Sequence, residues 1–389
     1  MIFMNVRKTY NLSDICRFVT SRTCNIENYI STENMLPNKG GITSPFNIPS
    51  GSAIAYQLGD VLISNIRPYF QKIWLANCDG ACSADVLCIR ANEKADSKYL
   101  YYLLSQQKFF DYVMSGAKGC KMPRGDKSQI MQWQISLPPL TEQKRIADIL
   151  SAIDDKIELN CRINANLEQQ AQALYKSWFV DNKKDDWKEV PLSEVADFVG
   201  GYSYKGNELV ESSMTAMATI KNFERKGGFK VDGFKDIVAS NKLKAEHHAN
   251  LFDILVAHTD LTQNADVIGN AEMLLTFDKY SDIIFSMDLV KVLPKQTFPY
   301  KYLLAALLKN PHFKKHCMGY VNGTTVLHMS KKALPEYVIN LPSVEEIQSM
   351  DNAFKAYYLK MAEILQENNS LSTLRDTLLP KLMSGEIKV

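Results

Sequence analysis

The sequence predicts an α+β protein in which two similar mixed α/β domains alternate with two long helices. The first observation is that no Gly or Pro follows Pro139 until Pro191, while the apolar positions step by four and three, as in a coiled-coil seam. The second is that the chain repeats itself at an offset that drifts from 180 to 204 residues. Such a repeat indicates two copies of one domain, each followed by one helix.

These observations divide the chain into four parts. We expect a first globular domain over residues 1–136 and a first spacer helix over residues 137–185. A second globular domain is expected over residues 186–340, and a second spacer helix with a short tail over residues 341–389. About 150 residues per globular part is an ordinary domain size.

The repeat also covers the elements before each helix. The segment LSDICRFV at Leu12 is similar to LSEVADFV at Leu192, and LGDVLIS at Leu58 is similar to LFDILVA at Leu251. Residues 83–104 match residues 286–307 at Ser, Asp and a Lys-Tyr-Leu triplet. In the first domain, β-branched alternation predicts one strand over residues 59–76 and another over residues 84–91, separated by a turn at Asp79-Gly80, and helical periodicity predicts a helix over residues 98–115.

Each long helix has a predicted seam. In the first helix its members are Ile146, Leu150, Ile153, Ile157, Asn164 and Leu167, and in the second they are Met350, Phe354, Tyr357, Met361, Asn368 and Leu371. A shift of 204 residues superposes Leu150 on Phe354 and Asn164 on Asn368.

Composition limits the classes of function. The net charge of +2 gives no global polycation, so a nucleic-acid surface would have to be local. No stretch reaches the roughly 18 apolar residues of a membrane span, and we expect a cytoplasmic protein. The cysteines Cys78, Cys82 and Cys88 lack the CxxC spacing of a zinc site, so no metal is expected.

Polar side chains gather in four loops. In the first domain, IRPYF with the following Lys72 offers Arg67 and Tyr69, and a glycine-rich loop without P-loop spacing offers Lys118, Lys121 and Arg124. Arg and Lys contact phosphates or guanine, and Tyr stacks on bases or donates to phosphate. A strand-end ion pair for Arg67 and a solvated basic loop are the alternatives.

The second domain carries different polar residues. Its first loop has glycines that permit turns presenting Tyr202, Tyr204 and Lys205. Two later segments are rich in side chains suited to base edges, although such residues also occur in ordinary turns. They contribute Thr259, Thr262, Gln263, Asn264, Thr324, Thr325 and His328.

Over nearly its whole length the chain resembles the specificity subunits of type I restriction-modification systems. The segments that carry the resemblance are LPPLTEQKRIADILSAIDDKIELN, ALYKSWFVD, GDVLISNIRP, HTDLTQNADVIG, NGTTVLHMS and LLPKLMSGEI. The second helix departs from the pattern, because LPSVEEIQ replaces LPPLTEQ. The resemblance implies two target-recognition domains that read a bipartite asymmetric sequence of double-stranded DNA, separated by two antiparallel helices with a pseudo-twofold relation.

The resemblance also implies partners. Two methyltransferase subunits and the motor-nuclease subunits would carry S-adenosylmethionine, ATP and Mg, leaving no cofactor in this chain. The residues agree, since the sequence has no [ND]PP[YF] motif, Walker A motif or convincing nuclease cluster. A coiled-coil scaffold that does not bind DNA, and an enzyme with sites in the two domains, are the alternatives.

An antiparallel pair makes one further prediction. Equivalent residues near the middle of the two helices would meet, placing Asn164 beside Asn368, where two amides satisfy each other and fix the register. The alternative is that both side chains reach water.

Overall fold

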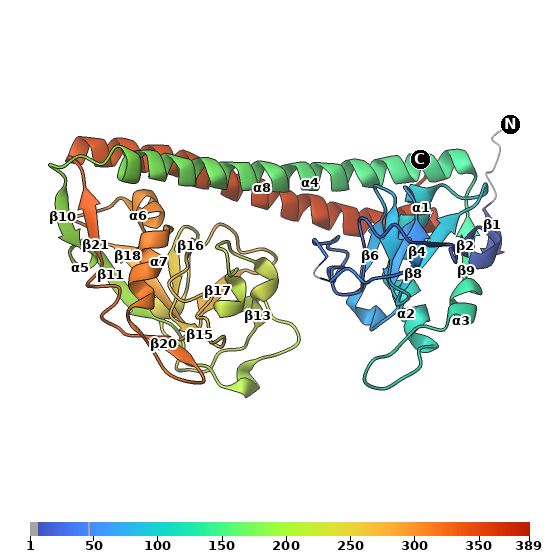
Figure 1. The fold of residues 1–389 in the computed structure, drawn as a ribbon, viewed down its shortest axis with the longest axis horizontal. Helices are drawn as coiled ribbons and strands as arrows, with labels where there is room; N and C mark the ends of the chain where they lie inside the picture. Colours follow the sequence, from blue (N-terminus) through green and yellow to red (C-terminus); the bar gives the residue numbers. More distant parts are fainter. Residues whose placement is uncertain (1–6, 46) are drawn as a thin grey trace. The chain divides into compact units, whose positions relative to one another are not determined.

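The computed structural model describes residues 7–45 and 47–389, which form two compact units (Figure 1). Unit 1 comprises residues 1–157 and 371–389, and unit 2 comprises residues 158–370. Each unit therefore contains one globular part and a portion of both long helices. These long helices are α4, Leu140–Lys176, which continues as the π-helical η3, Ser177–Asp181, and α8, Val344–Ser384.

Unit 1 is built on a four-stranded sheet of order β2-β8-β5-β6, in which all neighbours are antiparallel. Its strands and helices are β1 Lys8–Asn11, η1 Leu12–Asp14, β2 Cys16–Phe18, β3 Arg22–Thr23, β4 Ala53–Tyr56, β5 Val61–Ser64, η2 Pro68–Phe70, β6 Ile73–Leu75, β7 Gly80–Cys82, β8 Val86–Ala91, α1 Ser97–Leu104, α2 Gln107–Ser115, α3 Lys127–Met131 and β9 Gln134–Leu137. Strands β3, β4 and β7 form a second sheet, and β1 pairs with β9.

Unit 2 repeats the four-stranded sheet and the pairing of the first strand with the last. Its four-stranded sheet has the order β11-β18-β14-β16, and β10 pairs with β21. Its elements are β10 Lys188–Pro191, α5 Leu192–Val195, β11 Ala196–Gly200, η4 Gly206–Glu208, β12 Thr215–Ala218, η5 Ile220–Asn222, η6 Val231–Gly233, β13 Lys235–Asp236, η7 Ala245–His247, β14 Ile254–Ala257, β15 Thr259–Asp260, β16 Ala271–Met273, β17 Asp282–Phe285, β18 Leu289–Pro294, α6 Lys301–Leu308, α7 Pro311–Met318, β19 Val321–Asn322, β20 Leu327–Met329 and β21 Val338–Leu341. The helix pair α6–α7 corresponds to α1–α2, so the predicted internal repeat is confirmed.

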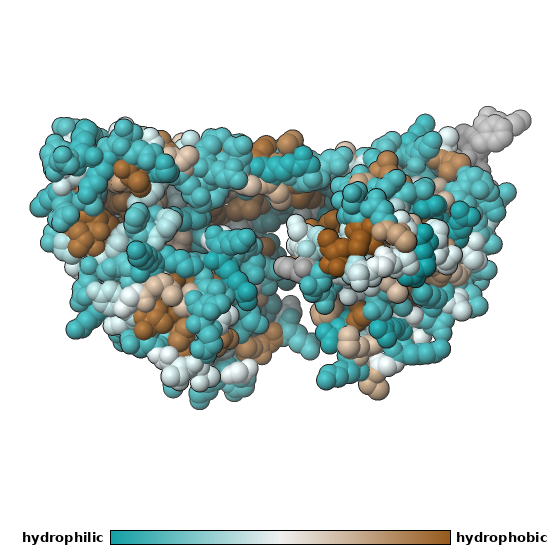
Figure 2. Space-filling model, in the orientation of Figure 1, coloured by the Kyte–Doolittle hydropathy of each residue, from teal (hydrophilic) through white to brown (hydrophobic). Residues whose placement is uncertain are grey.

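The buried apolar residues of each unit form one large cluster and two smaller ones. In unit 1 the core includes Tyr99, Phe109 and Phe110, which are almost completely buried. In unit 2, Phe313 and Phe354 are buried in the same way. On the face seen in Figure 2, apolar residues form separate patches surrounded by hydrophilic ones.

Two expected helices differ from those in the structure. The first long helix begins at Leu140 and not at Leu137, because Leu137 ends strand β9 and the Pro138-Pro139 pair separates the strand from the helix. The helix expected over residues 98–115 is two helices that meet at Ser105. There the Ser105 hydroxyl donates to the Tyr101 carbonyl at 2.7 Å, and Gln106 has an extended backbone.

The segment that was expected to form one strand is also divided. Residues 59–76 form strands β5 and β6, joined by the short helix η2. Two non-glycine residues with left-handed backbone flank this helix, Arg67 with φ 51° and Gln71 with φ 50°. The sequence IRPYFQK therefore reverses the chain where a continuous strand was expected.

Within unit 1 the portions of α4 and α8 run antiparallel. Ile146 and Leu150 lie in the same buried cluster as Leu379 and Leu382, and Arg375 pairs with Asp154 at 2.8 Å. The buried amide of Gln143 secures the start of α4, since it donates to the Pro138 and Lys94 carbonyls at 2.9 Å. This contact gives the Gln of the LPPLTEQ segment a structural role.

The same arrangement continues within unit 2. Asn164 Nδ2 lies 3.4 Å from the Met361 carbonyl, and the rings of Trp178 and Phe354 pack edge to face at 5.7 Å. The numbering rises along one helix as it falls along the other, so the expected antiparallel order is present. Of the predicted seam residues in both units, Ile146, Leu150, Met350, Phe354, Met361 and Asn368 are buried, and Ile153, Ile157, Asn164, Leu167, Tyr357 and Leu371 are half-buried.

The Asn pair predicted at the seam was wrong by one helical turn. Asn368 accepts a hydrogen bond from Asn160 Nδ2 at 2.8 Å, and Asn164 is not its partner. The Asn164 side chain is half-buried, and its Oδ1 has no hydrogen-bond partner among the described residues. One amide does donate to another at the seam, although the two residues are not equivalent in the repeat.

Candidate nucleic-acid interface

In unit 1 the end of strand β5 meets the glycine-rich basic loop. Ile66 forms an isolated bridge with Arg124, and the Arg67 amide donates to the Pro123 carbonyl at 2.8 Å. The two segments that sequence analysis selected separately, around Arg67 and around Lys121, are therefore neighbours. We name residues 65–70 with residues 118–124 the unit 1 patch.

The basic loop is a small hairpin. Lys118 and Arg124 exchange two backbone hydrogen bonds of 2.9 Å each, and Gly119 turns the chain with φ 98°. A side chain at that φ would be strained, which explains the glycine. Cys120 and Lys121 lie exposed at the tip.

Two of the loop cations have carboxylate partners. Lys118 Nζ lies 2.8 Å from Asp126, and this contact raises the pKa of Lys118 and lowers the pKa of Asp126. Arg124 pairs with Asp85 at 3.0 Å. Because both pairs are at the surface, they are weak and can exchange for phosphate contacts at little cost.

Polar atoms without partners lie beside the hairpin. Asn65 is 8% exposed, and its Oδ1 has no hydrogen-bond partner among the described residues; the same holds for the buried Nε of Arg67. Arg67 also has left-handed backbone, with φ 51°. Buried polar groups are normally hydrogen-bonded and backbone strain concentrates at functional sites, so a polar ligand would be stabilised here.

The two other candidate residues that follow Arg67, Tyr69 and Lys72, differ in exposure. Tyr69 is 48% exposed, and its ring centre lies 4.7 Å from that of Phe70. Lys72 instead turns inward, where its Nζ donates to the Thr32 carbonyl at 2.7 Å and burial lowers its pKa. The expectation that Lys72 lies beside Arg67 on a binding surface is corrected, because its ammonium holds the loop at Thr32.

Unit 2 brings together the corresponding segments. Strand β15, which follows β14, pairs with β20 so that Thr259 lies opposite His328. The Met329 amide donates to the His258 carbonyl at 2.9 Å. We name residues 258–264 with residues 322–328 the unit 2 patch.

The polar residues of the unit 2 patch surround a buried carboxylate. Asp260 is 3% exposed and accepts hydrogen bonds from the Thr262 amide at 2.7 Å and the Val267 amide at 2.8 Å. These bonds shape the loop that carries Gln263 and Asn264, both of which are exposed. Gln263 Nε2 donates to the Thr324 carbonyl at 2.8 Å and so ties this loop to the next one. The other exposed side chains of the patch are Leu261, Asn322, Thr324, Thr325 and His328.

Two candidates of unit 2 belong to its interior. Tyr202 is 2% exposed, and its hydroxyl lies 2.9 Å from Glu208. Thr259 is 3% exposed and donates to Asp288 at 2.9 Å. The expectation that a glycine turn presents Tyr202 is therefore corrected, because the ring enters an apolar cluster. Neither side chain is available at the surface.

The other two candidates of the loop that contains Tyr202 differ in exposure. Lys205 is exposed, whereas Tyr204 is half-buried, with Lys235 Nζ 3.3 Å from its hydroxyl and 5.4 Å from its ring centre. Neither residue lies in the unit 2 patch.

Asn65 and His258 were missed by the sequence analysis. The repeat contained the signal, because the offset of 193 residues that aligns Leu58 with Leu251 also aligns Asn65 with His258. Both residues directly follow the central strand of their sheet. Burial lowers the pKa of His258, and nearby His328 and Lys331 act in the same direction.

The described residues, 7–45 and 47–389, contain no group of three or more His, Cys, Asp or Glu side chains arranged to hold a metal ion. None of the helices in this range is long and apolar enough to cross a membrane.

The chain is similar in sequence to proteins of one class. The family model for the type I restriction modification DNA specificity domain matches residues 8–169. The chain is 25% identical to the specificity subunit of the type I restriction enzyme HindI of Haemophilus influenzae, over 98% of this chain and 99% of that protein. It is also 25% identical to the MjaVIII specificity subunit of Methanocaldococcus jannaschii, over 93% of this chain and 86% of that protein.

A solved structure has the same fold. The S subunit of a type I restriction-modification system from M. genitalium is 16% identical and aligns with a TM-score of 0.55 over 98% of each chain. Residues 8–169 therefore match the type I restriction modification DNA specificity domain in sequence. Over nearly its whole length the chain is similar to the specificity subunits of type I restriction enzymes, as its sequence motifs predicted.

Proposed function

We propose that this chain is the DNA sequence-recognition subunit of a type I restriction-modification complex, and that its two units each read one half of a bipartite, asymmetric target. The observation that carries the proposal is the position of the two patches. In each unit, the loop that follows the second helix of the helix pair contacts the residues just after a central strand of that unit's four-stranded sheet. The contact is the Ile66–Arg124 bridge in unit 1 and the Thr259–His328 pair in unit 2. Two domains that recognise different DNA sequences would use loops at equivalent positions with different side chains, because side-chain identity determines which bases are contacted.

The side chains of the two patches suit different kinds of contact. The unit 1 patch offers cations and an exposed tyrosine, which suit phosphate, guanine and base stacking. The unit 2 patch offers Gln263, Asn264, Thr325 and His328, which suit base edges. This difference between the side chains of the two patches supports a target whose two halves have different sequences.

In this proposal the chain is the non-catalytic subunit of the complex. It recruits two methyltransferase subunits and the motor-nuclease subunits, and these partners supply S-adenosylmethionine, ATP and Mg. The long helices α4 and α8 act as the spacer between the two DNA-recognition domains.

The test is to express the chain with its methyltransferase partner in a host without adenine methylation and to sequence the methylated DNA. The account predicts one asymmetric motif made of two short blocks separated by a fixed spacer. A single continuous motif, or no methylation above that of cells lacking this chain, would overturn it.

A further inference from the structure

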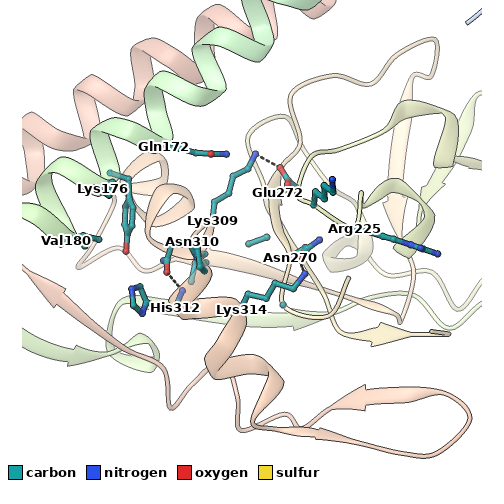
Figure 3. A pocket seen from close by; sticks show the side chains of 17 residues that line it. Gln172, Lys176, Val180, Arg225, Asn270, Glu272, Lys309, Asn310, His312 and Lys314 are labelled. Atoms are coloured by element: carbon teal, nitrogen blue, oxygen red, sulfur yellow. Dashed lines mark hydrogen bonds and ion pairs between the residues drawn. The ribbon is translucent and has the colours of Figure 1, made fainter. Parts of the chain in front are cut away.

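Unit 2 contains a cavity of about 720 Å³ that is separate from the unit 2 patch (Figure 3). It is bounded by the last turns of α4, the start of β16, the loop at residues 225–227 and the junction of α6 with α7. A volume of this size is typical of pockets for small molecules.

Two residues that line the cavity, Lys309 and Glu272, belong to an ion cluster. Lys309 Nζ lies 2.6 Å from Glu272 and 3.0 Å from Glu168, and Glu272 also accepts a hydrogen bond from the Gly228 amide at 2.6 Å. Glu272 is 4% exposed, so its charge is compensated inside the protein. Because these contacts join α4, β16, α6 and the loop at Gly228, the cavity walls are preformed.

Positive charge remains on one wall. The Lys314 ammonium is held by the Asp266 carbonyl at 2.6 Å and by Asn270 Oδ1 at 2.7 Å, and among the described ion pairs it has no carboxylate partner. Lys226 is exposed on the opposite loop and likewise forms none of those ion pairs. The amides at the start of α7 are not available to a ligand, because Asn310 Oδ1 accepts from His312 and Phe313. An anion in the cavity would therefore be held by lysine side chains.

The other wall is flat and apolar, with one amide at its edge. Tyr175 stacks on Phe179 with ring centres 5.2 Å apart and planes inclined by 11°, and Leu308 and Pro311 extend this surface. Gln172 reaches across the top of the cavity in Figure 3 and donates to Glu168 at 2.9 Å, which leaves its carbonyl oxygen to accept from a ligand.

We propose that this cavity binds a nucleotide, with its phosphate near Lys314 and Lys226 and its base beside Tyr175 and Gln172. A nucleotide has a flat ring that can lie beside an aromatic side chain and an anion that can lie beside ammonium groups without a carboxylate partner. The nucleotide is either free or part of a DNA strand, and both have this chemistry.

The test is calorimetric titration of the full-length chain with adenosine 5′-triphosphate and, separately, with inorganic pyrophosphate. We expect saturable binding of the triphosphate that is about tenfold weaker in Lys314→Met, since this variant cannot form the charge-assisted hydrogen bond. Lys226→Glu should also weaken it, and because Lys226 is exposed this variant keeps the fold. The matched control is Lys242→Glu, an exposed lysine outside the cavity, which should bind as the wild type does.

The alternatives give distinct results. Competition by a short single-stranded oligonucleotide, sensitive to Lys314→Met, would identify a DNA strand as the source of the nucleotide, and its absence would identify a free nucleotide. Pyrophosphate binding as tightly as the triphosphate would overturn the role of Tyr175. Failure of the triphosphate to bind at millimolar concentration, or equal weakening in Lys242→Glu, would overturn the site. The methylated motif is measured independently, so this failure would leave the proposed function standing.

Discussion

Asn160 Nδ2 donates a hydrogen bond of 2.8 Å to Asn368 Oδ1 within unit 2, and the two residues lie on the antiparallel helices α4 and α8. Asn160 is 1% exposed and Asn368 is 9% exposed. Asn160 also donates to Glu367 at 2.8 Å. A buried amide pair of this kind fixes the register of two helices at some cost in stability, because the same positions filled by leucine would bury apolar surface.

This pair gives a prediction with three variants. Asn160→Leu alone should destabilise the protein by roughly 1–3 kcal/mol, since it leaves the Asn368 oxygen buried without its partner. Changing both residues to leucine should restore that stability and raise the melting temperature above wild type. Asn164→Leu is the matched control, and it should be neutral or stabilising because Asn164 Oδ1 already lacks a hydrogen-bond partner among the described residues. Urea denaturation measures all three, and equal destabilisation by every variant would contradict the pairing.

The basic hairpin of the unit 1 patch should bind DNA backbone. Replacing Lys118, Lys121 and Arg124 with alanine should weaken binding to all DNA sequences and reduce the salt slope by about 0.9 for each phosphate that is no longer neutralised. The measurement is the affinity of the assembled complex at several salt concentrations. Lys242→Ala, at an exposed position outside both patches, is the control. An unchanged salt slope in the triple variant would remove the hairpin from the interface.

The unit 2 patch should act on one block of the target only. His328→Ala and Thr325→Ala remove exposed side chains without touching the buried Asp260, so the loop should keep its shape. Methylation should then occur at sites that differ in one block, with a cost of about 1–3 kcal/mol for each base that is no longer read. Lys205→Ala, exposed on a different loop of the same unit, should leave the motif unaltered. Relaxation of both blocks would show that the two patches do not read independently.

His258 should make the stability of unit 2 depend on pH. Burial, with nearby His328 and Lys331, lowers its pKa from the ordinary value of 6.5. The folded protein therefore binds fewer protons than the unfolded chain, so its stability is complete above pH 6.5 and falls as the pH drops through the lower, folded-state pKa. His258→Gln should flatten this part of the profile, as followed by thermal unfolding between pH 8 and the onset of acid denaturation. The same slope in wild type and variant would exclude His258 as its source.

The sequence predicted the large features because they are encoded in periodic patterns. The step of four and three along residues 146–167 identified a helix with a long partner, and the similarity of LGDVLIS and LFDILVA identified two copies of one sheet. These patterns follow from burial, and burial decides which element forms. The two patches were partly predictable for the same reason, since each follows a strand at an equivalent place.

The errors were in geometry that no pattern encodes. The pairing of Asn368 with Asn160 and not with Asn164 depends on the axial position of one helix against the other, and a shift of one turn keeps the same residues at the seam. The interior placement of Tyr202 depends on the contact with Glu208, and the inward turn of Lys72 depends on the Thr32 carbonyl. Such contacts between separate loops become visible only in three dimensions.

The central claim is that the two units read the two blocks of one target, and a domain exchange tests it most directly. Residues 1–136 would be replaced by the corresponding residues of another specificity subunit, with both long helices kept, and the methylated DNA would be sequenced. The account predicts that one block changes to that of the donor while the other block and the spacer stay the same. Alteration of both blocks, or retention of the original motif, would contradict it.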